Sequence, residues 1–267
     1  WMKVEDRAYT GKITGSSPDG VKMQLKAEQF LHQKEFKDPY SGLTWKQSNN
    51  DVPHWTFGKY AWNLDSTYLQ KQSGNFQFGQ YYTVVQWVNW RHTNSGWRTL
   101  LRGNYDHHLI VQNGGTKLGM YSNRNARFRV NSENLDIKDY NINKWHFVVY
   151  TGAGTSPTSY EGTTQYYIGD EDTCCENYGT SDRVVSGTTA YRYGWSGQGP
   201  GLLASFTYFD RVLTLDEIKQ QWQQTGRSER SLGGGKGKGK YITLTNVALR
   251  KDMEYEISLW VKLYGAN

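Results

Sequence analysis

The stretch Tyr81–Trp90 reads YYTVVQWVNW and decides the fold class. It consists mostly of aromatic and β-branched residues, which fit the pleated surface of a sheet. Alternate residues from Tyr82 to Trp90 are Tyr, Val, Gln, Val and Trp, so one face of the stretch is largely apolar. This period of two predicts a β-strand that packs against a core.

Short strand-like segments follow toward the C-terminus and are separated by turn residues. Asn113-Gly114 is one such turn, because both residues accept the positive φ angles of a tight hairpin. The chain contains 20 Tyr, 11 Trp and 29 Gly, a composition that favours sheets joined by many turns. Strands at this spacing, without helices between them, predict a sandwich or a barrel. The predicted segments are residues 100–101, 108–112, 117–121, 126–130, 145–150, 164–168 and 202–209.

One helix is predicted after the last of these strands, with Thr214 as its N-cap. Glu217 follows three residues later and completes a capping box, in which each side chain bonds the backbone N–H of the other residue. Ile218 and Trp222 are four residues apart and therefore form one apolar face. We expect a short helix, ended by Gly226, that docks on the sandwich.

Four segments, taken in order, resemble the laminin-G-like, concanavalin A-like lectin domains. They are FGQYYTVVQWVNW (residues 78–90), NKWHFVVYTG (143–152), TQYYIGDED (164–172) and GLLASFTYFDRVLTLDEIKQQW (201–222). The resemblance implies an all-β protein, an antiparallel concanavalin A-like jelly-roll sandwich with one short C-terminal helix. Because proteins of this fold include glycan lectins, protein-binding modules and modules that accompany enzymes, the resemblance does not name a ligand.

The sequence pattern divides the chain into four parts. We expect an N-terminal extension at residues 1–74, the sandwich at 75–225, a Gly/Lys-rich linker at 226–240 and a C-terminal β-hairpin arm at 241–267. Within the extension, VKMQLKAEQFLHQKEF (residues 21–36) fits either a helix packed on the sandwich or a pair of strands. A lone hairpin is marginally stable in water, so the C-terminal arm is expected to pair with another part of the protein or with another chain.

The formal net charge is +6, and the basic excess concentrates in the predicted linker. A basic segment suits an acidic partner. Gly-Lys repeats without interleaved aromatic residues are not typical of nucleic-acid binding, so we expect protein partners and no nucleic acid. The predicted partner-binding residues are Arg227, Arg230, Lys236, Lys238 and Lys240.

The sequence contains no run of 18 apolar residues and so predicts no membrane-spanning helix. It begins with Trp, which indicates that a leader has been removed or that the sequence is a fragment. No Asn-X-Ser/Thr glycosylation site is present. The compartment stays unknown, because a plastid-like organelle and a secreted or surface location both fit these observations.

The loop YRYGWSGQGP (residues 191–200) is rich in aromatic residues and glycine. Exposed aromatic faces stack on sugar rings, and neighbouring polar side chains supply directed hydrogen bonds. The alternative is that the large aromatic side chains pack beneath the loop. The predicted ligand-binding residues are Tyr191, Tyr193, Trp195 and Gln198 in this loop, together with Trp97.

An acidic segment precedes this loop and includes Asp170, Asp172 and Glu176. Carboxylates are calcium ligands, so calcium binding is one interpretation, and a solvated acidic loop is the other. The two cysteines, Cys174 and Cys175, are adjacent. They form two free thiols, a vicinal disulfide or a bridge to another chain.

Motifs of the common enzyme classes are missing from the sequence. We find no paired-carboxylate string of a sandwich glycosidase, no Gly-x-Ser-x-Gly, no phosphate-binding loop and no His-Glu-x-x-His. We therefore predict a protein that is not an enzyme. It would hold partner proteins in a larger assembly as a linker or scaffold, and the alternative is a carbohydrate-binding module of a secreted or surface protein.

Overall fold

The computed structural model describes residues 20–74, 76–91, 96–103, 106–112, 117–123, 127–129, 144–157, 161–183 and 191–226. The chain divides into two compact units, Trp1–Ser228 and Glu229–Asn267, and every described residue belongs to the first. Apart from Gly226, which ends the helix, the predicted linker and the C-terminal arm lie outside the described residues. Among these residues, no helix is long and apolar enough to cross a membrane.

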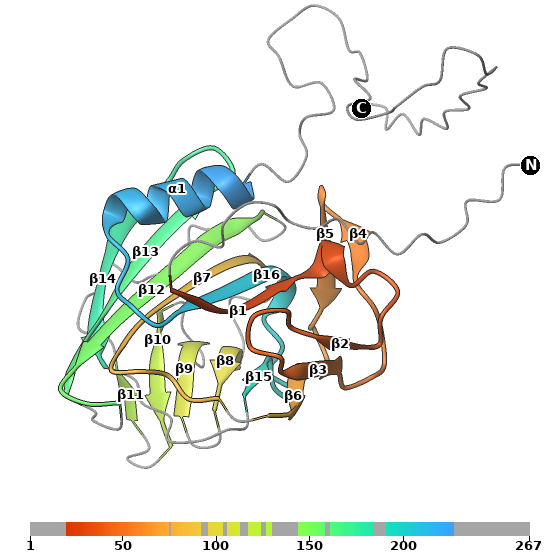
Figure 1. The fold of residues 1–267 in the computed structure, drawn as a ribbon, viewed down its shortest axis with the longest axis horizontal. Helices are drawn as coiled ribbons and strands as arrows, with labels where there is room; N and C mark the ends of the chain where they lie inside the picture. Colours follow the sequence, from red (N-terminus) through yellow and green to blue (C-terminus); the bar gives the residue numbers. More distant parts are fainter. Residues whose placement is uncertain are drawn as a thin grey trace, which may run out of the picture. The chain divides into compact units, whose positions relative to one another are not determined.

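Two antiparallel sheets lie face to face and confirm the predicted all-β sandwich (Figure 1). The first sheet has the order β14-β13-β12-β7-β16-β5-β4, with β1 paired to β16, and the second has the order β11-β10-β9-β8-β15-β6-β3-β2. The strands of the first sheet are β1 (Val21–Lys26), β4 (His54–Thr56), β5 (Lys59–Asn63), β7 (Tyr81–Trp90), β12 (His146–Gly154), β13 (Gly162–Asp170), β14 (Glu176–Asp182) and β16 (Gly201–Phe209). Those of the second sheet are β2 (Glu35–Lys37), β3 (Thr44–Gln47), β6 (Leu69–Ser73), β8 (Arg98–Arg102), β9 (Asp106–Val111), β10 (Leu118–Ser122), β11 (Arg127–Arg129) and β15 (Arg192–Tyr193).

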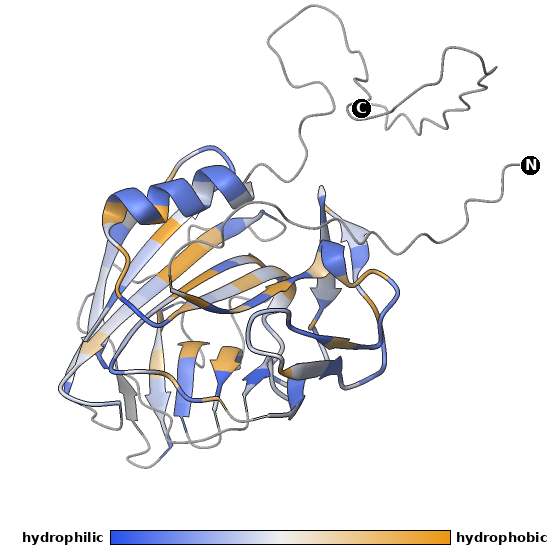
Figure 2. Cartoon of the chain, viewed as in Figure 1, coloured by the Kyte–Doolittle hydropathy of each residue, from blue (hydrophilic) through white to orange (hydrophobic). Residues whose placement is uncertain are grey.

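The strand β7 has the bounds that the sequence predicts, and it occupies the middle of the first sheet between β12 and β16. One of its faces, which includes Tyr82 and Trp90, packs into the core between the sheets. The other face, which includes Val85 and Trp87, packs in a second apolar layer with Ile218 of the helix α1 (Leu215–Gly226). Apolar residues accordingly concentrate on the strands, whereas α1 is mostly hydrophilic (Figure 2).

The helix α1 forms as predicted. The Glu217 N–H donates to Thr214 Oγ1 (3.3 Å), and the Thr214 N–H donates to Glu217 Oε2 (2.8 Å), which is the reciprocal pattern of a capping box. The Trp222 indole N–H donates to the Asp170 carbonyl (2.7 Å). This bond and buried Ile218 hold the helix against the first sheet.

The N-terminal boundary predicted at residue 75 falls inside the sandwich, because the six strands β1 to β6 all pair within the two sheets. Residues 21–36 form neither a helix nor a pair of strands with each other. They contain β1, the short 3-10 helix η1 (Ala27–Gln29) and the start of β2, and these two strands join different sheets. Strands this short give weak sequence signals, and distant partners stabilise them.

The acidic segment runs from the end of β13 to the start of β14, so the acidic loop itself is only residues 171–175. Within it, Cys174 and Cys175 are joined by a disulfide, one of the three arrangements that the sequence leaves open. The strand β15 is two residues long and connects β8 to β6 in the second sheet.

Candidate functional site

Two arginines lie side by side on the outer face of the second sheet. In the antiparallel pairing of β15 with β8, Arg192 is opposite Arg102 and Tyr193 is opposite Leu101. Tyr193 and Leu101 are buried in the core between the sheets. Because side chains alternate along a strand, both arginines point to the other, solvent-facing side.

Both guanidinium groups contact one tryptophan. The guanidinium carbon of Arg102 is 3.7 Å from the centroid of the Trp195 ring, and that of Arg192 is 4.7 Å from it. Arg192 also lies 5.1 Å from the ring centroid of Tyr68, and this ring stacks near Trp195 with a centroid distance of 6.3 Å. We call these four residues, Tyr68, Arg102, Arg192 and Trp195, the arginine–tryptophan surface.

The two positive charges of this surface have no carboxylate within ion-pair distance among the described residues. Burial lowers the pKa of Arg102, the charge of Arg192 lowers it further, and Asp106 acts in the opposite direction. The Nε atom of Arg102 is buried and has no hydrogen-bond partner in the part of the chain that the structure describes. Contact with the aromatic ring compensates part of the cost of holding two like charges together.

The predicted ligand-binding residue Gln198 borders this surface, and its amide is held in place. The Thr99 hydroxyl donates to Gln198 Oε1 (2.8 Å) and accepts from Nδ1 of His107 (3.0 Å). Burial, followed by the charge of Arg102, lowers the pKa of His107 to about 3, so this histidine is neutral near pH 7. The bond to Thr99 fixes the carbonyl end of the Gln198 amide, which orients its NH₂ group as a donor.

Trp97 is half-buried and belongs to a separate aromatic pair on the same sheet. Its ring meets that of Tyr121 edge to face at a centroid distance of 5.0 Å, and Tyr121 in turn lies 6.0 Å from the ring of His107. The structure therefore brings Trp195 and Gln198 together, and contacts through Tyr121, His107 and Thr99 connect Trp97 to them.

The structure places the predicted ligand-binding residues Tyr191 and Tyr193 inside the core and not at the surface of the loop. Both side chains are buried in the core, with exposed fractions of 1% and 0%. The Tyr191 hydroxyl accepts from the Phe78 N–H (3.3 Å), and the Tyr193 hydroxyl donates to Gln86 Oε1 (2.9 Å). Burial raises the pKa of both phenols. The pattern Tyr-Arg-Tyr is the alternation of a strand, which directs the two tyrosines inward and Arg192 outward.

The sequence interpretation missed Arg102 and Tyr68 as members of the site. Arg102 ends the predicted strand around residues 100–101, and its polar character there signals an outward-facing position. Its neighbour across the sheet, Arg192, is 90 positions later in the chain. Only the register of β8 with β15 brings these charges together, and this register is not visible in the sequence.

The predicted calcium ligands are not assembled into a described site. Asp170 Oδ1 accepts the backbone N–H groups of Asp172 (2.8 Å) and Thr173 (2.7 Å), which closes the turn after β13. The neighbouring Glu171 forms an ion pair with Lys59 (3.6 Å). Among the described residues, no group of three or more His, Cys, Asp or Glu side chains could hold a metal ion. The side chain of Glu176 is not described, and calcium binding stays a prediction.

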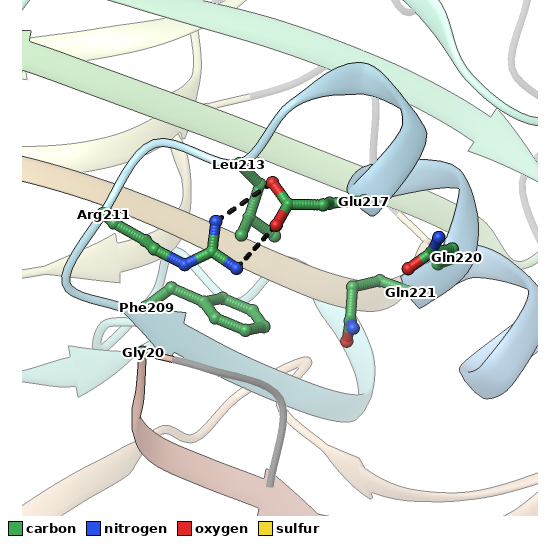
Figure 3. Close-up of a pocket in the computed structure, with 7 residues that line it drawn as sticks. All are labelled: Gly20, Phe209, Arg211, Leu213, Glu217, Gln220 and Gln221. Atoms are coloured by element: carbon green, nitrogen blue, oxygen red, sulfur yellow. Dashed lines mark hydrogen bonds and ion pairs between the residues drawn. The ribbon is translucent and has the colours of Figure 1, made fainter.

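A pocket of about 600 Å³ lies between α1, the end of β16 and Gly20. Its charged groups, Arg211 and Glu217, are paired with each other at 2.7 Å (Figure 3). The Arg211 bond, followed by the Thr214 N–H, lowers the pKa of Glu217 to about 2. These contacts hold Glu217 in the first turn of the helix, so the charged pair of this pocket has a structural role.

The five predicted partner-binding residues of the linker lie outside the described residues: Arg227, Arg230, Lys236, Lys238 and Lys240. Their role as a basic contact for a protein partner stays a prediction.

No family model matches the sequence, and no curated protein matches it. Solved structures with a similar fold include two mutants of a protein named HCR/D, with TM-scores of 0.51 and 0.52 and identities of 11% and 12%. These matches cover 77% and 78% of this chain and 52% of the other. A sialidase of Trypanosoma rangeli matches with a TM-score of 0.47 and 15% identity over 79% of this chain and 34% of its own. The receptor-binding domain of botulinum neurotoxin type G matches with a TM-score of 0.48 and 13% identity over 77% of this chain and 51% of its own.

This chain thus spans about half the length of the HCR/D chains and about a third of the sialidase chain. At these identities the likeness shows a common β-sandwich fold and does not extend to function. The prediction that the chain is not an enzyme, which rested on missing catalytic motifs, is wrong as an exclusion. One of the similar chains is a sialidase, an enzyme, so this architecture does not exclude a catalytic protein.

Proposed function

We propose that the protein is a recognition module that binds an acidic carbohydrate at the arginine–tryptophan surface. The observation that carries the proposal is the pairing of Arg102 with Arg192 across β8 and β15, both in contact with Trp195. This proposal retains the carbohydrate-binding interpretation of the sequence, including the laminin-G-like resemblance. It differs in the binding surface, which is the outer face of the second sheet and not the tip of the loop at residues 191–200.

The ligand is expected to carry a negative charge. Two guanidinium groups at adjacent sheet positions repel each other, and no carboxylate among the described residues pairs with either of them. A carboxylate or sulfate bound between them removes this repulsion and forms charge-assisted hydrogen bonds, which are stronger than neutral ones. The planar guanidinium suits bidentate contact with such an oxyanion.

The remaining polar groups favour a carbohydrate. Sugar hydroxyls are recognised by a small number of oriented donors and acceptors beside aromatic rings. The Gln198 amide, oriented by Thr99, is such a donor, and the half-buried ring of Tyr68 lies close to Trp195. Arg102 and Arg192 extend from strands, and the Gln198 amide is held by Thr99, so these groups lose little entropy when a ligand binds.

Titration calorimetry with a panel of acidic and neutral oligosaccharides tests this function. Arg192→Gln and Arg102→Gln should each weaken binding of a uronic, sialylated or sulfated sugar by about 10- to 100-fold, since hydrogen bonds to charged groups contribute about 1.5–3 kcal/mol. Neutral sugars should bind weakly to all variants. Lys22→Gln makes the same change of charge in an exposed pair with Asp210 on the first sheet, and it should leave binding unchanged. Equal binding by the wild type and both arginine variants would contradict the proposal.

A linker or scaffold role in a larger assembly is the second proposal, and the basic segment 227–240 of the sequence supports it. Deletion of residues 227–267 should then abolish capture of acidic partner proteins, whereas Arg192→Gln should not affect it. Capture of acidic partner proteins that survives this deletion would contradict the linker role.

A further inference from the structure

The hairpin of β4 and β5 lies at the edge of the first sheet (Figure 1). It carries three exposed aromatic side chains. Trp55, Phe57 and Tyr60 have exposed fractions of 60%, 49% and 36%. Trp55 and Tyr60 are directly opposite in the hairpin, and their rings meet edge to face at 5.0 Å. We call these three residues the aromatic hairpin tip.

The turn of this hairpin places a large apolar ring where small polar residues are usual. Both turn residues have positive φ, +51° at Phe57 and +84° at Gly58, as a two-residue hairpin turn requires. A bulky side chain is disfavoured in this conformation, so the turn is held by other contacts. The Trp145 indole N–H donates to the Phe57 carbonyl (2.8 Å), and the Arg91 guanidinium lies 5.5 Å from the Phe57 ring centroid. Strained residues of this kind concentrate at functional sites.

The charged groups around the tip are engaged with one another. His54 contacts Asp51 at 2.9 Å, and Arg91 contacts Asp65 at 2.9 Å. Lys59 is buried against the Trp87 ring and pairs with Glu171. Among the described residues, the charged groups beside the tip are therefore engaged in ion pairs, and the tip presents apolar and amphipathic surface.

The exposed area of the tip is small for a protein partner. Aromatic side chains have about 150–250 Å² each, so the three exposed fractions amount to roughly 300 Å². A stable protein interface buries about 800 Å² on each partner. A carbohydrate would need oriented polar groups beside the rings, and the charged ones here are already paired. A lipid–water interface needs neither a large area nor oriented polar groups, and it favours Trp and Tyr because their rings are amphipathic.

We propose that the aromatic hairpin tip inserts into the interfacial region of a lipid bilayer. Trp55 and Phe57 supply the apolar surface, and the hydroxyl of Tyr60 stays at the level of the headgroups. Because the neighbouring charges form ion pairs, binding depends on apolar area and not on anionic lipid. This membrane contact is independent of the arginine–tryptophan surface, which lies on the other sheet.

Sedimentation with phosphatidylcholine vesicles tests the insertion in the full chain. We expect Trp55→Ala to lower the partition coefficient about tenfold or more, since burial of apolar area drives partitioning. Phe57→Asn should have a similar effect, because Asn accepts positive φ and preserves the turn. Tyr81 is the matched control: it is 48% exposed at the opposite end of β7, about 30 Å from Trp90, so Tyr81→Ala should not change partitioning.

A second measurement identifies the inserted side chain. Brominated lipids should quench part of the tryptophan fluorescence of the wild type, and Trp55→Phe should remove that part while it retains vesicle binding. Absence of wild-type binding to neutral vesicles would overturn the proposal. Binding that requires anionic lipid and disappears in high salt would also overturn it. Arg192→Gln should bind vesicles normally and Trp55→Ala should bind acidic sugars normally, so each proposal can fail without the other.

Discussion

The hydrogen bond between Tyr193 and Gln86 crosses the core from one sheet to the other, and its removal gives the sharpest test of the packing. The Tyr193 hydroxyl on β15 donates to Gln86 Oε1 on β7 at 2.9 Å, and both side chains are fully buried. Nε2 of Gln86 already has no partner among the described residues. Tyr193→Phe would therefore leave the whole amide without a described partner.

The cost of this substitution follows from two contributions. The mutant loses the hydrogen bond, and it retains a buried acceptor that water solvates in the unfolded chain. Together these lower the free energy of unfolding by about 1–3 kcal/mol. For a domain of this size, each kcal/mol corresponds to roughly 2–4 °C in the unfolding midpoint. Tyr150→Phe is the matched control, because the Tyr150 hydroxyl is also buried but has no partner in the described structure. Removal of the Tyr150 hydroxyl should leave the free energy of unfolding unchanged or increase it.

Equilibrium unfolding in urea, followed by circular dichroism, gives the free energies for a double-mutant cycle. Gln86→Leu alone should also destabilise, since it leaves the Tyr193 hydroxyl unpaired. The double variant Tyr193→Phe/Gln86→Leu should regain most of the free energy of unfolding that the single variants lose. The expected coupling energy is about 1–3 kcal/mol. If the two single losses simply add, or if Tyr193→Phe costs no more than Tyr150→Phe, the assignment of this bond is refuted.

Two further predictions concern the loop before β16 and the buried histidine of β9. A Cβ at Gly199 would lie 1.8 Å from the Leu64 carbonyl, so Gly199→Ala should cost at least about 3 kcal/mol in chemical unfolding. Gly197→Ala meets no atom within 4 Å and has only its positive φ of +72° to disfavour it, so a loss equal to that of Gly199→Ala would contradict this reasoning. Burial lowers the pKa of His108 to about 3 from 6.5, so the unfolded state binds the proton first and stability falls as pH drops from 6.5 toward 3. His108→Leu should reduce this slope in unfolding curves measured at pH 7, 5 and 4, and an unchanged slope would argue against a buried neutral imidazole.

Sequence patterns predicted the elements whose signals are local. Eight of the ten residues of the strand β7 have strong β propensity, and the capping box of Thr214 and Glu217 marks the start of α1 within four residues. Each of these segments carries enough information by itself to select one conformation. The sequence also predicted that Trp195 and Gln198 lie close to each other, because both residues belong to one short loop.

The parts that sequence reasoning missed depend on contacts between distant residues. The strand β15 has two residues and exists because β6 and β8 lie on either side of it. Its register brings Arg192 opposite Arg102, which no local pattern announces. The aromatic hairpin was missed for another reason. Its turn is Phe57-Gly58, whereas Asn-Gly is the pattern that predicts such a turn.

The short strand β15 also determines how the two groups of strands in the second sheet are joined. Among the described strands it joins a group of four, β8 to β11, to a group of three, β2, β3 and β6, through pairings of only two residues on each side. These two short pairings are the place where the second sheet would open first under thermal fluctuation. A bound anion that bridges Arg192 and Arg102 would stabilise the pairing of β15 with β8. Ligand binding would therefore also hold the two groups of strands together.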